Sequence, residues 1–200
     1  MKKIIIIGCG GHANSCIEII ENSKEFKIYG LVCDKKKGKF DKYKILGSDK
    51  SLGIIKKNCS NAFIGIGQIK SYRIREKLFK ILKKKGFKLP KILAKNSYVS
   101  KSSKIGEGTI VMHNAFINRN VSIGDNTIIN TGAIIEHDVC IGSNCHISTG
   151  AIINGGVKID NGTFVGSGSV INQGINIGKN CIISSSSKIK IDLNSGSVVK

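Results

Sequence analysis

Histidines are the side chains in this sequence best suited to proton transfer, and one of them stands beside an acid. His137 is followed directly by Asp138, whereas the neighbours of His12, His113 and His146 are not acidic. A histidine titrates near neutral pH, so it can take a proton from a reacting group, and an adjacent carboxylate can orient the ring or raise its basicity. A His–Asp pair also occurs on ordinary surface turns, which is the alternative for an isolated pair.

A glycine-rich segment near the N-terminus is suited to binding an anion. The segment 8–12, GCGGH, follows four isoleucines and precedes a helical pattern. Such a turn brings backbone N–H groups and a helix N-terminus together, where an anion can bind. Asp34 follows the next apolar run. In α/β folds with a glycine-rich turn of this kind, a residue at that position often contacts a ribose or a sugar. Ala13 replaces the third glycine of the dinucleotide pattern, so a tight turn without a ligand is the alternative for this segment alone.

The elements that must position these residues follow from a six-residue repeat. Every sixth residue from Leu93 to Ile189 is Ile, Leu or Val, and the position four residues further on is small or β-branched from Ser97 to Ser169. This period fits neither a helix nor simple strand alternation, but it does fit a short strand and a turn. Three such units close a triangular coil of 18 residues, so residues 93–188 predict a little over five stacked coils.

The first half of the chain predicts a different architecture. Strands are expected over residues 3–7, 27–33 and 62–66, and helices over 13–21 and 71–85. Alternating strands and helices indicate a small parallel α/β domain. We therefore expect a Rossmann-like domain over residues 1–92, in which residues 86–92 form the link, and a β-helix over residues 93–200.

The repeat resembles the hexapeptide-repeat, left-handed β-helix acyltransferases, in which prisms form trimers with active sites in the grooves between them. Both halves together resemble one branch of that family, the sialic acid O-acetyltransferases and the nucleotide-linked 4-amino-sugar N-acetyltransferases of bacterial glycan biosynthesis. The matching residues are Gly8-Cys9-Gly10-Gly11-His12 and Asn130-Thr131-Gly132-Ala133-Ile134-Ile135-Glu136-His137-Asp138.

The resemblance implies roles for several residues. His137 becomes the general base and Asp138 its acidic partner, where the family often has Glu. The resemblance places acetyl-CoA against His146, Ser167 and Ser185. The implied contacts to the sugar nucleotide or to the acetyl group are made by Gly10, Gly11, His12, Asp34, Lys35, Gly67 and Asn130.

Two departures from the family pattern concern binding. Lys35 stands where some relatives carry a second acid, which bears on the identity of the nucleobase or sugar. Relatives often end in a Gly-x-Pro-Ala segment, whereas the only proline here is Pro90. We therefore expect the distal end of coenzyme A to be held differently.

The leading hypothesis is an acetyl-CoA-dependent N-acetyltransferase that acts on a nucleotide-linked amino sugar by direct attack, without an acyl-enzyme and without a metal. O-acetylation of a sialic-acid-like sugar is the nearest alternative. A metal-dependent hydratase would need His113, His137 and His146 to converge, and their spacing does not suggest one site. A non-catalytic sugar-nucleotide-binding protein is the third alternative.

Charge, cysteines and targeting signals bound the remaining possibilities. The formal net charge is +19, and residues 1–92 hold 23 of the 32 basic and 7 of the 13 acidic residues. The lysine-rich stretches lack interleaved aromatics, so we expect small anionic ligands rather than nucleic acid. Without a signal peptide or a long apolar run, we expect a cytoplasmic protein without membrane insertion. Its seven cysteines are expected to be reduced thiols.

Overall fold

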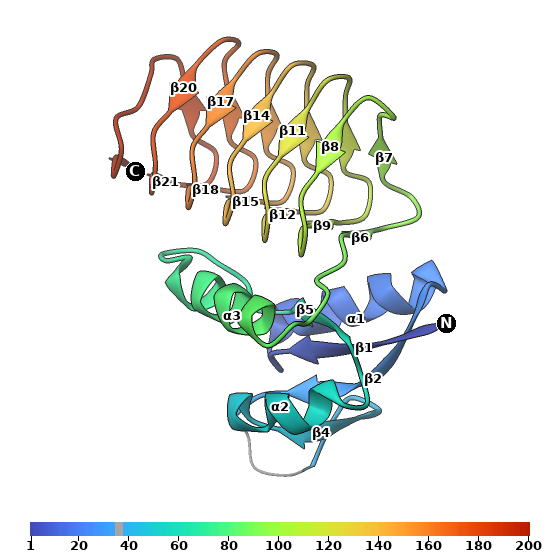
Figure 1. Ribbon diagram of the computed structural model, residues 1–200. Helices are drawn as coiled ribbons and strands as arrows, with labels where there is room; N and C mark the ends of the chain where they lie inside the picture. Colours follow the sequence, from blue (N-terminus) through green and yellow to red (C-terminus); the bar gives the residue numbers. More distant parts are fainter. Residues whose placement is uncertain (35–37) are drawn as a thin grey trace.

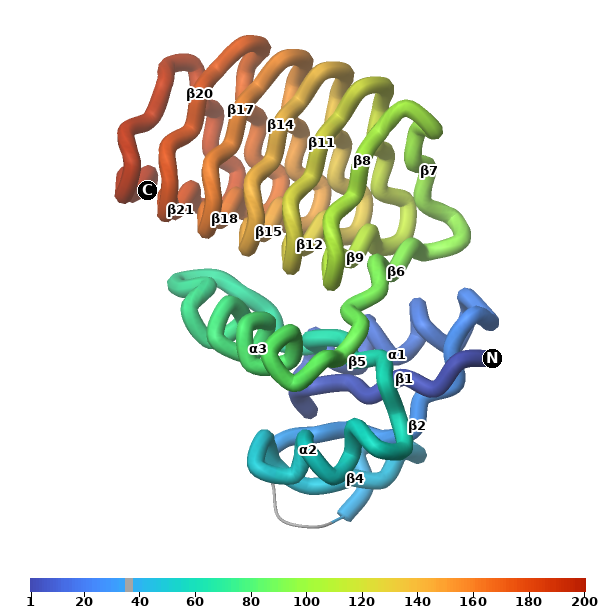
Figure 2. Tube along the Cα trace, viewed as in Figure 1, coloured from blue at the N-terminus to red at the C-terminus, as the bar shows by residue number. Residues whose placement is uncertain are grey.

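The computed structural model describes residues 1–34 and 38–200 and consists of an α/β domain packed against a triangular β-helix. Figure 1 shows the β-helix as a stack of coils above the α/β domain, with the helix α3 directly beneath it. The tube in Figure 2 follows the coils in order from the link between the domains to the C-terminus at the far end of the stack. The predicted two-part fold is confirmed.

The α/β domain has a five-stranded sheet in the order β3-β4-β2-β1-β5, parallel except for the β3–β4 hairpin. Its strands are β1 (Lys2–Ile7), β2 (Phe26–Val32), β3 (Lys39–Phe40), β4 (Tyr43–Gly47) and β5 (Asn61–Ile64). Its helices are α1 (Gly11–Ser23), the single 3-10 turn η1 (Asp49–Ser51), α2 (Leu52–Lys56) and α3 (Arg73–Lys84). The predicted strands and helices are present within a few residues. Strands β3 and β4 and helix α2 lie in a stretch that carried no clear pattern.

The β-helix has three faces, which we name after the polarity of their outward side chains or after the domain that lies against them. The docked face, turned toward the α/β domain, consists of β6 (Ile92–Leu93), β9 (Ile110–Val111), β12 (Ile128–Ile129), β15 (His146–Ile147), β18 (Phe164–Val165), β21 (Ile182–Ile183) and β23 (Val198–Val199). The apolar face consists of β7 (Tyr98–Val99), β10 (Phe116–Ile117), β13 (Ile134–Ile135), β16 (Ile152–Ile153), β19 (Val170–Ile171) and β22 (Lys188–Ile189). The polar face consists of β8 (Lys104–Ile105), β11 (Ser122–Ile123), β14 (Cys140–Ile141), β17 (Lys158–Ile159) and β20 (Asn176–Ile177).

The six-residue period arises because the second residue of each short strand points into the prism. These residues form one continuous apolar core, and from Val111 to Ile189 each is buried. Equivalent strands pair in parallel 18 residues apart, as Ile117 does with Ile135. Turns are made by Gly and Asn in the left-handed region, for example Asn144 at φ 57° and Gly132 at φ 66°. The last coil is shorter, since Ile182 pairs with Val198.

The two domains share a second core. Outward residues of the docked face, Ile110 and Ile128 among them, pack in one buried cluster with Cys16 and Ile20 of α1. Burying aliphatic side chains of this size stabilises the interface by about 1.5–3 kcal/mol each. The α/β domain is therefore fixed to one face of the prism, and its loops have a defined place beside the prism's corners.

Arg75 of α3 ties the carboxyl end of β5 to the prism. Its side chain is 1% exposed. The guanidinium donates to the backbone carbonyl of Ile64, and to both the carbonyl and the side-chain oxygen of Asn126, at 3.3, 2.8 and 2.9 Å. Burial lowers the pKa of Arg75 to about 10, so the group remains charged at neutral pH. The contact holds the loop after β5, which carries Gly67, at the domain boundary.

Candidate active site

The His137–Asp138 pair lies on a turn between β13 and β14, at the corner that joins the apolar face to the polar face. His137 Nδ1 lies 2.9 Å from Asp138 Oδ2, and the two side chains are 56% and 57% exposed. Asn120 Nδ2 also donates to Asp138 at 3.2 Å, and these two hydrogen bonds lower the pKa of the Asp138 carboxyl. A carboxylate acceptor at Nδ1 assigns the proton to that nitrogen, which leaves the Nε2 lone pair available to accept a proton.

The ring of His137 rests on Gly155, which occupies the same corner one coil further along. A Cβ placed on Gly155 would lie 2.7 Å from both Cε1 and Nε2 of His137. Gly155 is therefore part of the seat of this imidazole. The printed sequence shows a glycine there, but only the 18-residue stacking reveals what it touches.

His146 projects from the docked face, as its position in the repeat predicts, but it lies beneath the loop after β5 and is 6% exposed. Its Nδ1 donates to the carbonyl of Gln68 at 2.5 Å, and its Nε2 lies 3.1 Å from Asn130 Nδ2. Burial lowers the pKa of His146 to about 4, so the ring is neutral. Both ring nitrogens have partners in the domain interface, and the residue also lines a cleft at the domain boundary, so its contact with the cosubstrate stays a prediction.

A cleft of about 680 Å³ lies between the start of α1, the loop after β5 and the corner that joins the docked face to the apolar face. It brings together five of the predicted site residues from both domains. They are Gly11, His12, Gly67, Asn130 and His146. Ser15, Gln68, Thr131 and Thr149, which the sequence interpretation did not single out, line the same cleft.

His12 lines this cleft and has one ring nitrogen without a partner among the described residues. Its Nε2 is buried and has no hydrogen-bond partner among residues 1–34 and 38–200. Burial lowers the pKa of His12 to about 3, with a smaller contribution from the charge of Arg75. A neutral, buried ring nitrogen without a partner costs free energy unless a ligand supplies one. This is the expected state of a residue that contacts a polar ligand.

The start of α1 is open to an anion. Gly10 caps the helix without a side-chain hydrogen bond. A Cβ at Gly10 or Gly11 would meet no atom of the described chain within 4 Å, so the backbone is accessible there. The free N–H groups of the first turn and the helix dipole favour a negatively charged group at this point.

A second cleft, of about 240 Å³, lies at the carboxyl ends of β1 and β2 and includes Asp34, whose contact with the sugar nucleotide stays a prediction. Gly8, Cys33, Asp49, Ile66 and Lys77 also line it. Burial, and then the neighbouring Asp34, raise the pKa of Asp49. Asp49 was missed because it follows β4, a strand with an irregular register against β2 and no clear sequence pattern. The predicted contact at Lys35 lies outside the described residues.

Ser167 and Ser185, predicted to hold the cosubstrate, stand on the same corner of the prism as the larger cleft. They are spaced by one coil from Thr149 and from each other, so the four hydroxyl residues Thr131, Thr149, Ser167 and Ser185 form a column along that corner. Ser167 Oγ lies 2.9 Å from Ser148 Oγ. His137 stands on the other corner of the apolar face, with β13 between it and Asn130.

The metal-dependent alternative can be compared with this geometry. In the described ranges, no three His, Cys, Asp or Glu side chains are grouped so that they could hold a metal ion. His113 shares a corner with Thr131, and its Nδ1 is hydrogen-bonded to Asn96 at 2.7 Å, whereas His137 lies on another corner.

Within the described part of the chain, no helix is both long and apolar enough to cross a membrane.

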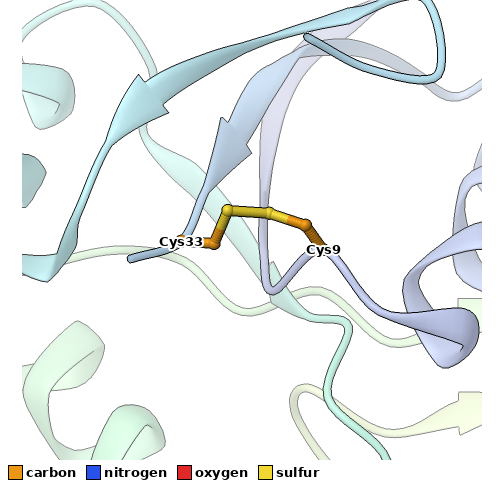
Figure 3. The surroundings of a disulfide bond; sticks show 2 residues. All are labelled: Cys9 and Cys33. Carbon is orange, nitrogen blue, oxygen red and sulfur yellow. A yellow bond between two sulfur atoms is a disulfide. The ribbon is translucent and has the colours of Figure 1, made fainter. Parts of the chain in front are cut away.

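The cysteines differ in part from the expectation of reduced thiols. Cys9 and Cys33 form a disulfide that links the glycine turn to the end of β2 (Figure 3). The prediction was wrong for this pair, because strands β1 and β2 are neighbours in the sheet and bring two residues 24 apart in sequence to a Cα separation of 6.2 Å. Among the free cysteines, Cys140 is exposed. The other free cysteines are buried, namely Cys16, Cys59, Cys145 and Cys181.

Comparisons with known proteins agree with this architecture. Residues 3–82 match the model of the PglD N-terminal domain, and residues 120–155 match that of the bacterial transferase hexapeptide (six repeats). No curated protein sequence gives a significant match.

Solved structures match over the whole chain. Perosamine N-acetyltransferase from Caulobacter crescentus, in complex with CoA and GDP-perosamine, is 30% identical with a TM-score of 0.92, covering 99% of this chain and 93% of that one. The acetyltransferase domain of PglB from Neisseria gonorrhoeae, in complex with acetyl coenzyme A, is 25% identical with a TM-score of 0.93, over 98% and 95%. WeeI from Acinetobacter baumannii shares the fold: it is 23% identical with a TM-score of 0.87, covering 99% of this chain and 96% of that one.

These comparisons and the fold define a β-helix transferase with an α/β domain appended to its first coil. The chain belongs to the family of hexapeptide-repeat acetyltransferases that carry a PglD-type N-terminal domain. The predicted family is confirmed.

Proposed function

We propose that this acetyltransferase uses acetyl-CoA to N-acetylate the amine of a nucleotide-linked amino sugar in bacterial glycan biosynthesis. One observation carries the proposal: a single cleft gathers the glycine turn, His12 and Asn130 at the domain boundary, next to a column of hydroxyl residues on the prism. A relative of 30% identity over nearly the whole chain holds CoA and GDP-perosamine.

The sugar nucleotide is proposed to lie across both clefts of the α/β domain. Asp34 in the smaller cleft would accept hydrogen bonds from the ribose hydroxyls. The diphosphate would lie on the open backbone of Gly10 and Gly11, where the N–H groups and the dipole of α1 favour negative charge. The sugar would then extend into the larger cleft, where His12 Nε2 needs a partner.

Acetyl-CoA is proposed to run along the corner that carries Thr149, Ser167 and Ser185. The hydroxyls and turn N–H groups of this column offer hydrogen bonds to the amide groups of the pantetheine arm. The acetyl end would reach the larger cleft near Asn130. In this arrangement His146 acts through other groups, since its ring binds Gln68 and Asn130 and so holds the cleft wall in place.

The enzyme is proposed to be a homotrimer, and the outward rows of the prism support this. The docked face is buried from Ile92 to Phe164, where the α/β domain lies against it. The polar face presents Lys104, Ser122, Cys140, Lys158 and Asn176. The apolar face presents Tyr98, Phe116, Ile134, Ile152 and Val170 and ends at Lys188, with Tyr98 56% and Phe116 37% exposed. A contiguous apolar stripe of this kind marks an interface.

A ring of three copies around the apolar faces would complete the site. A closed cyclic arrangement brings one corner of the face in one copy against the other corner in the next copy. The His137 corner would then meet the neighbouring copy's corner at Asn130. This explains why a single chain keeps the proposed base apart from the cleft.

The proposed reaction is a direct acyl transfer. His137 Nε2 takes a proton from the sugar amine as its nitrogen attacks the thioester carbonyl, and Asp138 stabilises the charged imidazole through Nδ1. Backbone N–H groups stabilise the oxyanion of the tetrahedral intermediate. The C–S bond breaks, the amide forms, and the CoA thiolate takes the proton back from His137.

We also propose a cytoplasmic location, where acetyl-CoA is made.

Incubation of the full-length protein with labelled acetyl-CoA and a panel of UDP-, GDP- and CMP-linked sugars tests this function. We expect label on one amino sugar, and loss of transfer by a factor of about 10²–10⁴ in His137→Ala. Binding of both substrates should persist in that variant, as should the native mass. Near-normal transfer by His137→Ala would reject the assigned base, and transfer to a hydroxyl would reject N-acetylation.

A further inference from the structure

The glycine turn is the point where the two clefts of the α/β domain meet. Gly8 lines the smaller cleft and Gly11 the larger one. The consecutive residues Ile66 and Gly67 divide in the same way between the two clefts. A ligand that occupies both clefts must therefore pass over the turn between Gly8 and Gly11.

A disulfide lies at this crossing. Cys9, inside the turn, is bonded to Cys33, which lines the smaller cleft and directly precedes Asp34 (Figure 3). Both cysteines are half-buried, so a small thiol can reach them, in contrast to the buried free cysteines of the cores. The bond joins the two segments that the diphosphate and the ribose would contact.

We propose that Cys9 and Cys33 form a reversible thiol–disulfide site that controls how tightly the sugar nucleotide binds. The inference rests on the proposed function, because it requires one ligand across both clefts. The bonded pair places two sulfur atoms between the turn and the end of β2 and fixes the turn against that strand. In the bonded structure the backbone of Gly10 and Gly11 is open to a diphosphate, and the bond holds it at a fixed place beside Asp34. Reduction frees the turn from the end of β2, so the two segments no longer meet one ligand in a fixed arrangement.

The chemistry is a two-electron exchange with a cellular thiol such as glutathione or a dithiol protein. A donor thiolate attacks one of the two sulfurs, the S–S bond breaks, and a mixed disulfide forms. A second donor thiolate attacks the donor sulfur of the mixed disulfide and breaks that bond. Both protein sulfurs are then thiols with one proton each, and the two donor thiols are joined as a disulfide. Oxidised glutathione drives the reverse reaction.

The experiment compares the full-length protein after incubation with oxidised glutathione and after reduction with dithiothreitol. Peptide mass mapping reports the Cys9–Cys33 bond. Calorimetry measures the Kd of each UDP-, GDP- and CMP-linked sugar of the panel, and the Kd of acetyl-CoA. We expect reduction to weaken sugar-nucleotide binding by roughly tenfold or more, with an unchanged Kd for acetyl-CoA, which is proposed to bind the prism.

Two variants identify the cysteines responsible. In Cys9→Ser the Kd of the sugar nucleotide should be the same after oxidation and after reduction, whatever its absolute value. Cys140→Ser removes the exposed cysteine of the polar face and should keep the full ratio between these two Kd values of the native protein. Thermal unfolding of each variant reports whether it is folded.

Three results would overturn the inference: no Cys9–Cys33 bond after oxidation, equal Kd values with the bond formed, or an undiminished ratio in Cys9→Ser. A failure of the proposed function looks different. In that case acetyl-CoA binds and the bond forms, but no sugar nucleotide binds in either state, and the proposed control is refuted with it.

Discussion

The imidazole of His137 lies against the α-carbon of Gly155, so closely that a Cβ at Gly155 would come within 2.7 Å of Cε1 and Nε2 of the ring. The two residues are 18 apart and occupy the same corner in consecutive coils. The position of the proposed base is therefore set by its own Asp138 on one side and by the absence of a side chain in the next coil.

Gly155→Ala should move His137 without removing it. Gly155 does not have a positive φ, so alanine is tolerated by the backbone, and the ring must shift instead. A displacement of about 1 Å can cost about 10²-fold in rate, so we expect kcat to fall by that order while the KM values change little. Steady-state kinetics measures both.

The matched control is Gly53→Ala in α2, where a new Cβ meets no described atom within 4 Å. Its kcat should equal that of the native enzyme. A Gly155→Ala enzyme with unchanged kcat would show that the ring position is not critical, or that His137 is not the base.

Stability should fall as the pH drops from neutral to about 5, because two neutral histidines are buried at the domain boundary. Burial lowers the pKa of His146 to about 4 and that of His12 to about 3, whereas an unfolded histidine titrates near 6.5. Between these values the unfolded state binds more protons, so the free energy of unfolding decreases with falling pH. We expect a loss of about 2 kcal/mol for each histidine between pH 7 and pH 5.

Urea unfolding at both pH values, at one protein concentration, checks this expectation. His146→Gln is the informative variant, since Gln does not titrate and can keep a hydrogen bond to the loop. Its pH-dependent loss should be smaller than that of the native protein by the share of one histidine. An identical loss would mean that His146 is not buried as a neutral ring.

A charge on the apolar face should dissociate the proposed trimer. Phe116 stacks on Tyr98 with ring centroids 5.0 Å apart in the outward row of that face. Phe116→Glu places a carboxylate in the interface without touching the prism core, and removing a charge from water there is costly. Sedimentation should show a single copy, and activity should fall with the trimer because the site is shared between copies.

Ser122→Glu puts the same charge on the polar face and serves as the control. It should leave both the mass and the activity unchanged. A monomeric native enzyme with full activity would refute the shared site, as would dissociation by the charge at Ser122.

The inward side of the prism was predictable, and its outward side was not. A six-residue period needs only the identity of the buried residue, so the column from Leu93 to Ile189 fixes the coil. Which outward row is covered depends on the other domain. Ile128 and Ile134 look alike in the sequence, yet one packs under α1 and the other lies on the apolar face.

The site was predictable where a motif carried it and not where two distant segments meet. Gly11, His12 and Asn130 were found from motifs, and they share one cleft. Gly155 and Gln68 act through contacts that arise only from coil stacking and from domain docking, so no local pattern marks them. The Cys9–Cys33 bond likewise depends on the order of strands in the sheet.

The stacking of equivalent strands 18 residues apart makes the length of this β-helix adjustable in whole coils. Insertion of one further coil between the coil of Thr149 and the C-terminus would extend the hydroxyl column by one residue and leave the cleft unaltered. A deletion of one residue in the same region would instead turn every later core side chain out of the prism. Natural variation in this part of the chain should therefore come in multiples of a coil, and the reach available to the tail of coenzyme A should change in the same steps.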